Sequence, residues 1–276
     1  MQRRRRQFNW LPLVFGGRED GILRGVSAQP TIDILGLDYA RMSASEALDE
    51  AERLYEQEAP AWIAVENAHG VNLATSDPAH RDRLNRSNLL LNDGKGVMLG
   101  ARLLGRGFPE DLNGNHFSPL LLHRAAERGW PVFFLGAAPG VAQRAADRLM
   151  TSIPGLKITG VRDGFFTPDD NPEIYEAIRD SGGGLLMVGM GNPIQEQWLD
   201  EHIDRSGARL GVTVGAFFDF QAGEVERAPS WMNRLGLEWV HRLLKEPKRM
   251  WRRYLLGNPR FIFNVLRSRL AQRKAL

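Results

Sequence analysis

Asp93 is the residue of this sequence whose type and position are best suited to chemistry. It follows an apolar run and Asn92, and it precedes two glycines, in the segment LLLNDGKGVMLG. A buried strand is expected to end there and a helix to begin at Gly96. The carboxylate can cap that helix by accepting hydrogen bonds from its free N–H groups. It can also act as a general base, or orient a hydroxyl group of a ligand. The local pattern favours the cap and leaves the second use open.

Three further segments combine small and polar residues in the same way, each after an apolar run: residues 67–69, 136–140 and 189–196. Asn67 closes the first of these runs and is expected to face Asp93 across a cleft. Gly136 opens the sequence GAAPG, which either forms a tight turn or leaves N–H groups free to bind an anion or a diphosphate. That sequence matches neither a dinucleotide fingerprint nor a P-loop.

The last of these segments, GMGNPIQEQW, contains the polar candidates Asn192, Gln195 and Glu196. Gly191 permits close packing, and Pro193 suits the start of a helix. Gln195 and Glu196 then lie one turn into that helix. There they either bind ligand hydroxyls or serve as first-turn residues that face the positive end of the helix dipole.

The elements that position these segments alternate between short apolar runs and amphipathic stretches. This alternation is typical of a parallel sheet that is covered on both faces. We therefore predict an α/β fold, with a Rossmann-like, mostly parallel sheet, helices on both faces and a basic helical C-terminal appendage. In such a sheet the strand-end loops meet at one edge, which places the four polar segments in one site. The expected elements include strands at 31–39, 61–67, 88–94, 131–140 and 184–191, and helices at 43–58, 96–105 and 118–129, with Ser43, Asp77 and Gly129 at helix ends.

The charge is divided unevenly along the chain. The formal net charge is +3, yet residues 227–276 carry thirteen Lys and Arg against two Glu, a net +11, and residues 1–30 carry a net +4. The segment 31–226 is therefore at −12. We predict a disordered basic leader over 1–30, the α/β domain over 31–226 and the appendage over 227–276. An acidic body with a basic tail is typical of a protein that meets an anionic surface, and it argues against a nucleic-acid partner.

The appendage interleaves aromatic and aliphatic residues with Arg and Lys at helical spacing, and breaks are expected at Pro247 and at 257–259. Such helices can lie in an anionic membrane interface, pack on the body with arginines reaching a phosphate-bearing substrate, or form a solvated charged face. No apolar run reaches the roughly 20 residues of a membrane span. The N-terminal segment also lacks the pattern of a secretory signal.

The residues that several kinds of chemistry require are missing from this sequence. Cysteine is absent, so neither a disulfide nor a thiolate metal site is expected, which fits a reducing cytoplasm. The histidines have no metal-ligand spacing and no D-x-D pair is present, so we expect no metal and no other cofactor. A G-x-S-x-G elbow is missing as well.

Several of these segments occur in the order of a known family. The motifs GNPIQE and RAPSWMNRLGLEWVHRLLKEPKR and, less specifically, NDGKG resemble those of the WecG/TagA/CpsF glycosyltransferases, family 26. The resemblance runs from about residue 31 to about residue 265. It implies an inverting, metal-independent transfer of a sugar from a UDP-sugar to a polyprenyl-diphosphate-linked saccharide, on the inner face of the bacterial membrane. The UDP-sugar is then a substrate and not a cofactor, and the product is an exopolysaccharide, a capsule or a teichoic acid.

The resemblance also implies roles for individual residues. Asp93 matches the proposed general base, Asn67 lines the same pocket, and Gln195 lies at the donor site. Four arginines of the appendage are expected to close over the site and meet the lipid diphosphate: Arg227, Arg234, Arg242 and Arg249. The other candidate binding residues are Asn92, Gly136, Gly191, Asn192, Glu196 and His116.

Two positions depart from the family pattern. Val65 replaces an expected threonine, and His116 lies where an Asp is expected. The donor sugar therefore stays open between a hexose and an N-acetylhexosamine such as ManNAc. A non-catalytic protein that binds nucleotide sugars or lipid diphosphates is the alternative function. The resemblance is also consistent with a homo-oligomer.

Overall fold

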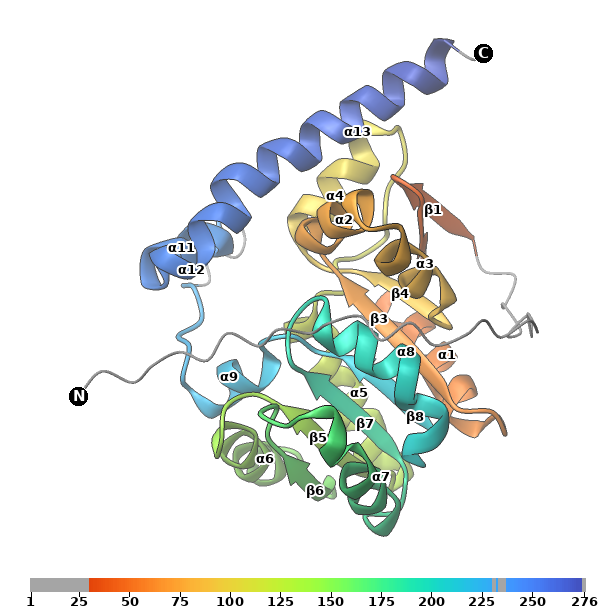
Figure 1. The fold of residues 1–276 in the computed structure, drawn as a ribbon, viewed down its shortest axis with the longest axis vertical. Coiled ribbons are helices and arrows are strands. Elements are labelled where there is room, and N and C mark those ends of the chain that lie inside the picture. The colour runs from red at the N-terminus through yellow and green to blue at the C-terminus, as the bar shows by residue number, and fades with distance from the viewer. Residues whose placement is uncertain (1–29, 230–231, 233–236, 275–276) are drawn as a thin grey trace.

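The structure is a computed structural model of the 276-residue chain, and it describes residues 30–229, 232 and 237–274. A central sheet of six parallel strands forms the middle layer, in the order β4-β3-β8-β7-β5-β6 (Figure 1). The predicted α/β class with a parallel sheet is confirmed, whereas the predicted leader lies almost entirely outside the described residues. The strands are β3 (Ala61–Glu66), β4 (Leu89–Asn92), β5 (Pro131–Gly136), β6 (Lys157–Arg162), β7 (Leu185–Gly189) and β8 (Leu210–Thr213).

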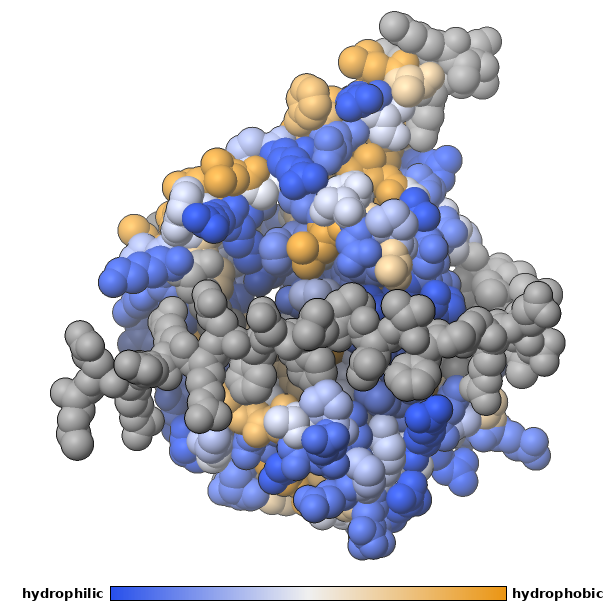
Figure 2. Space-filling view, viewed as in Figure 1, coloured by the Kyte–Doolittle hydropathy of each residue, from blue (hydrophilic) through white to orange (hydrophobic). Residues whose placement is uncertain are grey.

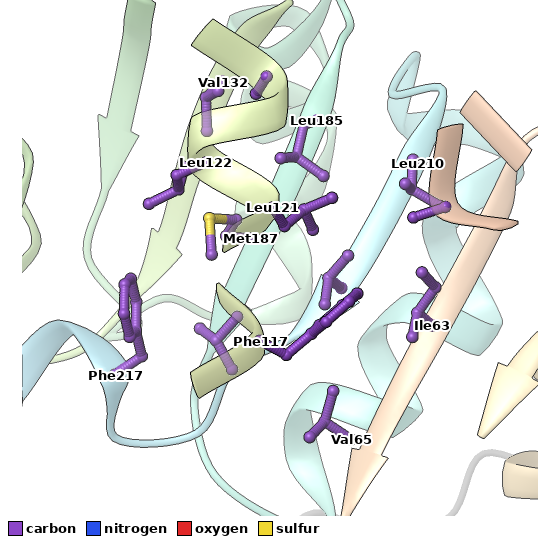
Figure 3. Close-up of a cluster of buried hydrophobic side chains, with 14 of the residues drawn as sticks. Ile63, Val65, Phe117, Leu121, Leu122, Val132, Leu185, Met187, Leu210 and Phe217 are labelled. Atoms are coloured by element: carbon purple, nitrogen blue, oxygen red, sulfur yellow. The ribbon is translucent and has the colours of Figure 1, made fainter. Parts of the chain in front are cut away.

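Helices cover both faces of this sheet, because its central strands are apolar on both sides. Four of the five residues of β7 are hydrophobic and all five are buried, as expected for a strand between two layers of helices. Figure 3 shows one of the two cores, where Phe117, Leu121 and Leu122 meet sheet residues such as Met187. This face is covered by α1 (Ala44–Glu56), α5 (Gly114–Arg128), α6 (Val141–Ser152) and α9 (Phe217–Ala222). The opposite face is covered by α2 (Ala68–Ser76), α3 (Pro78–Arg86), α4 (Gly94–Leu103), α7 (Asn171–Asp180) and α8 (Ile194–Ser206).

The predicted helix ends are confirmed in three places. Ser43 caps α1 in a capping box with Glu46, the Asp77 side chain caps α3, and Gly129 ends α5 in the left-handed conformation. The start of α5 differs from the prediction, because Asn113 caps the helix and Pro119 lies within it.

The prediction of a single strand over 31–39 is wrong. The segment is an antiparallel hairpin of β1 (Thr31–Ile34) and β2 (Leu37–Ala40), which forms a separate two-stranded sheet. Leu35 and Gly36 both have positive φ, at 57° and 85°. Such a two-residue turn matches the twist of the strands that it joins. The signal was Gly36, which was overlooked inside an apolar run.

The appendage consists of α11 (Glu238–Lys245), α12 (Pro247–Trp251), a π-helical segment η2 (Arg252–Leu256) and α13 (Gly257–Lys274). The break expected at Pro247 is confirmed, but the one at 257–259 is wrong, since helical structure is continuous there. Pro259 lies in the first turn of α13, where a missing N–H is tolerated, and the wide π turn precedes it.

The appendage packs on the α/β body through α13, which contacts α2 and α4. Phe261 and Val265 are buried there, and Gly100 makes room for the Phe261 ring, since a Cβ at position 100 would lie 2.6 Å from its Cζ. The Asn72 side chain donates to the Gly257 carbonyl at 2.7 Å. These contacts place the basic helices next to the carboxyl ends of the strands.

Candidate active site

A continuous cavity of about 2680 Å³ lies at the carboxyl ends of the strands. One wall, the body wall, is formed by the strand-end loops, including Asn67, Asp93, Ala137 and Gly191. The other, the appendage wall, is formed by Arg227 and by residues of the C-terminal helices: Glu238, Trp239, Arg242, Arg252, Arg253, Tyr254 and Asn258. The expectation that the four polar loops meet in one site is confirmed. The cavity is larger than the roughly 300–1,000 Å³ typical of a small-ligand pocket, so it has room for two substrates.

Asp93 occupies the N-cap position of α4, but its side chain makes no capping hydrogen bond. Its Oδ2 instead accepts a hydrogen bond from Asn67 Nδ2 at 3.0 Å. The first N–H of the helix, at Gly94, donates to Asp111 Oδ1 at 2.9 Å. The prediction that the Asp93 side chain caps the helix by a hydrogen bond is therefore wrong. The Asp111 carboxylate accepts the hydrogen bond from the first N–H of α4 instead. This leaves the Asp93 carboxylate at the cavity.

Asn67 connects two of the strand ends. It caps α2, where its Oδ1 accepts from the His69 N–H at 3.0 Å, and its amide points across to Asp93. The amide is thereby fixed in orientation by the helix that it begins. The predicted juxtaposition of Asn67 and Asp93 is confirmed.

The environment of Asp93 makes its carboxylate more basic. Burial raises the pKa of Asp93 from its usual 3.8, and the nearby negative charge of Asp111 raises it further. The Asn67 amide, the positive charge of Arg253 and the Gly114 N–H act in the opposite direction. A general base gains strength as its pKa approaches the working pH. The site therefore suits proton abstraction by Asp93.

The polar side chains of the GNPIQE motif are held by hydrogen bonds within the protein. Gln195 is only 1 % exposed, and its Oε1 accepts from the Gly191 and Gly215 N–H groups, both at 3.1 Å. Its amide donates to Glu196 Oε1 at 2.6 Å. Gln195 thus ties together the loops that follow β7 and β8. Asn192 lines the cavity, and its amide donates to Glu66.

Three predicted residues do not line the cavity. Asn92 and Glu196 are fully buried, and the Asn92 amide donates to the Glu110 carbonyl at 3.0 Å. Gly136 lies against β7, where a Cβ would approach the Gly189 carbonyl oxygen to 2.3 Å. Close packing of two strand ends, and not a ligand, explains that glycine. Of the two readings of Glu196, the structure favours the acid at a helix start, since the buried side chain lies in the first turn of α8.

Three other predicted residues do reach the cavity: His116, Arg227 and Arg242. His116 is in the first turn of α5, and its Nδ1 lies 3.0 Å from the Asp111 carbonyl oxygen. Arg242 stacks on the Phe220 ring at 5.3 Å, which attaches α11 to the body. Arg234 and the side chain of Arg249 lie outside the described parts of the chain, so their predicted roles remain predictions.

Sequence reasoning missed three residues at the cavity. Arg253 is close enough to lower the pKa of both Asp93 and His69. It lies four residues after Arg249, so helical spacing was a usable signal. Glu238 lies near Asp93. Burial raises the pKa of Glu238, and the negative charge of Asp93 raises it further. Thr213 lines the cavity at the end of β8, and its Oγ1 accepts from the Val65 N–H at 2.9 Å.

The described residues contain no group of three or more His, Cys, Asp or Glu side chains placed to hold a metal ion. Two histidines at the cavity are neutral at pH 7: burial lowers the pKa of His69 to about 4, with Arg253 adding to the effect, and burial likewise lowers the pKa of His202 to about 4. The cationic side chains that line the cavity are Arg83 and Lys95 of the body and the arginines of the appendage wall.

The fold and the site define a Rossmann-like α/β protein with a two-walled cavity at the carboxyl ends of its strands. The model of the glycosyl transferase WecG/TagA/CpsF family matches residues 32–275. The chain belongs to this family, and it is a glycosyltransferase.

Two relatives match most of the chain. An N-acetylglucosaminyldiphosphoundecaprenol N-acetyl-beta-D-mannosaminyltransferase of Bacillus spizizenii is 30% identical over 239 residues, which cover 86% of this chain and 91% of that protein. An enzyme of the same name from Bacillus subtilis is 29% identical over 86% of this chain and 92% of its own length.

Proposed function

We propose that this glycosyltransferase transfers a sugar from a UDP-sugar to a saccharide linked to polyprenyl diphosphate, with inversion and without a metal ion. The observation that carries the proposal is the opposition of the two cavity walls. Asp93, released from capping and oriented by Asn67, faces the arginines of the appendage. One wall offers a base and the other offers positive charge for phosphates.

The reaction would be a single displacement. Asp93 accepts the proton of an acceptor hydroxyl, whose oxygen attacks the anomeric carbon of the donor as the bond to the UDP oxygen breaks. UDP leaves with the bonding electrons, and attack from the opposite face inverts the anomeric centre. Arg253 and Arg242 at the cavity, together with N–H groups at helix starts, would stabilise the leaving diphosphate.

The acceptor side fits a lipid diphosphate. An apolar groove of about 540 Å³ runs between α11 and α13. Its residues Trp239, Tyr254, Asn258 and Ile262 also line the main cavity, so the two spaces adjoin. A diphosphate on the arginines would place an isoprenoid chain at this groove. Both relatives carry an undecaprenol diphosphate in the names of their acceptors, which supports the same class of acceptor here.

The outer surface of the appendage suits the inner face of an anionic membrane. Figure 2 shows hydrophobic groups among hydrophilic ones along the upper edge of the molecule. The large apolar side chains exposed on α11–α13 are Leu244, Trp251, Leu255, Leu256, Phe263, Leu266 and Leu270. Mixed apolar and basic helix surfaces bind at a membrane interface. None of the helices in the described part of the chain has the length and apolar character to cross a bilayer. We propose a peripheral attachment through α11–α13.

The donor is proposed to be a UDP-hexose or a UDP-N-acetylhexosamine. The relatives name ManNAc as the transferred sugar, so UDP-ManNAc is the first donor to test. Val65 and His116 line the cavity at the two positions that depart from the family pattern. We expect the choice of donor sugar to depend on these two positions.

The test is transfer of radiolabelled sugar from a panel of UDP-sugars to polyprenyl-diphosphate-linked GlcNAc and other lipid-linked saccharides, with and without EDTA. We expect one donor to be used, with equal rates in both buffers and an anomeric configuration opposite to that of the donor. Loss of activity in EDTA would contradict metal independence. A retained configuration would contradict the single displacement.

A further inference from the structure

Two carboxyl groups, those of Glu66 and Glu196, are buried beneath the cavity and belong to no salt bridge with a lysine or arginine among the described residues. Both side chains are 0 % exposed. Glu66 ends β3, Glu196 lies in the first turn of α8, and α8 packs on β3. Neither residue lines the cavity. The mechanism proposed above uses neither of them, so their burial needs another explanation.

Each of these carboxyl groups uses one oxygen and leaves the other without a partner. Glu66 Oε1 accepts from the Asn192 side-chain amide and, at 3.3 Å, from the Asn67 N–H. Glu196 Oε1 accepts from Gln195 Nε2 at 2.6 Å. The Oε2 atom of each is buried and has no hydrogen-bond partner within the described ranges. An ionised oxygen in that state loses its hydration without compensation.

The surrounding charges do not neutralise two carboxylates. His80 on α3 is 3.9 Å from Glu66 Oε2, but burial lowers the pKa of His80 to about 4, so the imidazole is neutral at pH 7. Arg83 on the same helix favours the ionised form of Glu196 only, and Asp93 adds a further negative charge beside Glu66. The Tyr39 hydroxyl of β2 donates to the Glu66 backbone carbonyl and not to its carboxyl group.

We propose that Glu66 and Glu196 hold one proton between them at neutral pH, and that this pair is the positioning element that fixes Asn192 and Gln195 at the cavity. A proton removes the charge that the buried site does not compensate, while each Oε1 remains an acceptor for the amide of the motif. Burial, and for Glu66 the negative charge of Glu196, raise the pKa values of the two groups, that of Glu196 to about 7.

The packing around Glu66 is consistent with a dedicated place for this carboxyl group. A Cβ on Gly70 of α2 would lie 1.8 Å from Glu66 Oε2, so only glycine leaves the space that the group fills. Through Asn192 and Gln195 the pair connects the ends of β3, β7 and β8. The expected effect of this carboxyl pair on donor binding depends on the proposed function, whereas the protonation of the pair does not.

The first test is infrared spectroscopy in ²H₂O, which reports the C=O stretch of a protonated carboxyl group. Wild-type protein at pH 7 should show this band, the band should disappear as the pH is raised, and the E66Q/E196Q double variant should lack it. Glu50→Gln is the matched control, because Glu50 is also buried (6 % exposed) but is paired with Arg53 on α1. Absence of the band from the wild type, or its persistence in the double variant, would overturn the proposal.

The second test measures UDP binding by calorimetry, which needs neither the lipid acceptor nor the correct sugar. Glu66→Gln keeps a neutral acceptor for Asn192, so its Kd should stay within about threefold of wild type, whereas Glu66→Ala leaves the amide unpaired and should weaken binding by about tenfold. In the transfer assay Glu66→Ala should raise the donor KM more than it lowers kcat. Equal binding by all three proteins would refute the positioning role. Normal UDP binding and a normal band without transfer to any lipid-linked saccharide would count only against the proposed function.

Discussion

The two walls of the cavity are held in place by different kinds of interaction. The body wall stands on buried hydrogen bonds: Asn67 holds Asp93, and Gln195 bridges two loops while almost completely buried. The appendage wall carries four arginines among acidic, aromatic and amide side chains, and it is attached largely through Phe261 and Val265 of α13. The body thus fixes the geometry of the base, whereas most of the arginines at the cavity belong to a part that docks on it. Reactivity and phosphate binding should therefore be separable by mutation.

The largest effect is expected for the base of the body wall. Asp93→Asn keeps the shape of the side chain but removes its basicity, so the rate of transfer should fall by at least about 100-fold. UDP affinity measured by calorimetry should change little. Asp111→Asn is the matched comparison, because Asp111 is the neighbouring carboxylate that binds the Gly94 N–H. If Asp111→Asn abolished transfer and Asp93→Asn did not, the role of base would belong to Asp111.

On the appendage wall, Arg253→Ala should reduce transfer by about tenfold or more, because a charged hydrogen bond to phosphate contributes about 1.5–3 kcal/mol. Arg267→Ala, an exposed arginine further along α13, is the control and should leave the rate unchanged. The effect should shrink as salt is added, since ions screen such contacts. Equal effects of the two substitutions would show that Arg253 acts only through the overall charge of the helix.

The junction between the walls can be broken from either side. Phe261→Ala removes a buried ring, a change that typically costs about 3–5 kcal/mol in a packed core. Gly100→Ala on α4 introduces a Cβ into the same contact. Both should speed hydrogen exchange in α13 and lower transfer, while the sheet keeps its protection. Exchange that is unchanged in α13 would show that the helix is held by other contacts.

The smallest expected effect is on the pH dependence of folding stability. The pKa of Glu196 rises from its usual 4.5 to about 7 on folding, so the folded state binds more protons in this range and the group lowers stability as the pH rises from about 4.5 to about 7. Neutral buried histidines act oppositely below about 6.5, because the unfolded chain takes up their protons first. Denaturant unfolding of wild type and Glu196→Gln across this range isolates the Glu196 contribution as their difference. Parallel pH profiles would contradict it.

Much of the body wall was predictable from local sequence, whereas the network beneath it was not. Apolar strands followed by Asn67 and Asp93 are a local signal, and the parallel sheet brings their ends together. The hydrogen bond from the first N–H of α4 to Asp111 depends on a loop seventeen residues away, and no sequence periodicity predicts it. Glu66 was overlooked because a charged residue at the end of an apolar strand resembles a solvent-facing one. Its burial depends on Asn192, 126 positions later in the chain.

The helical and basic character of the appendage was predictable from sequence, but the course of its backbone was not. Interleaved aromatic and basic residues indicated amphipathic helices, yet the continuity of the chain through Pro259 depends on the π turn before it. The docking of α13 needs Gly100, which looked like an ordinary helix glycine. Tertiary contacts of this kind become visible only when both partners are placed.

The length of α13 has a mechanical consequence. Its 18 residues extend over about 27 Å at the rise of an α-helix. Phe261 and Val265 fasten its first half, and the last turns project beyond the body (Figure 1). A stiff rod clamped near one end is a lever. Its outer turns would set the tilt of the cavity mouth against any plane on which they rest, so removing a turn would change that angle without touching a residue of the site.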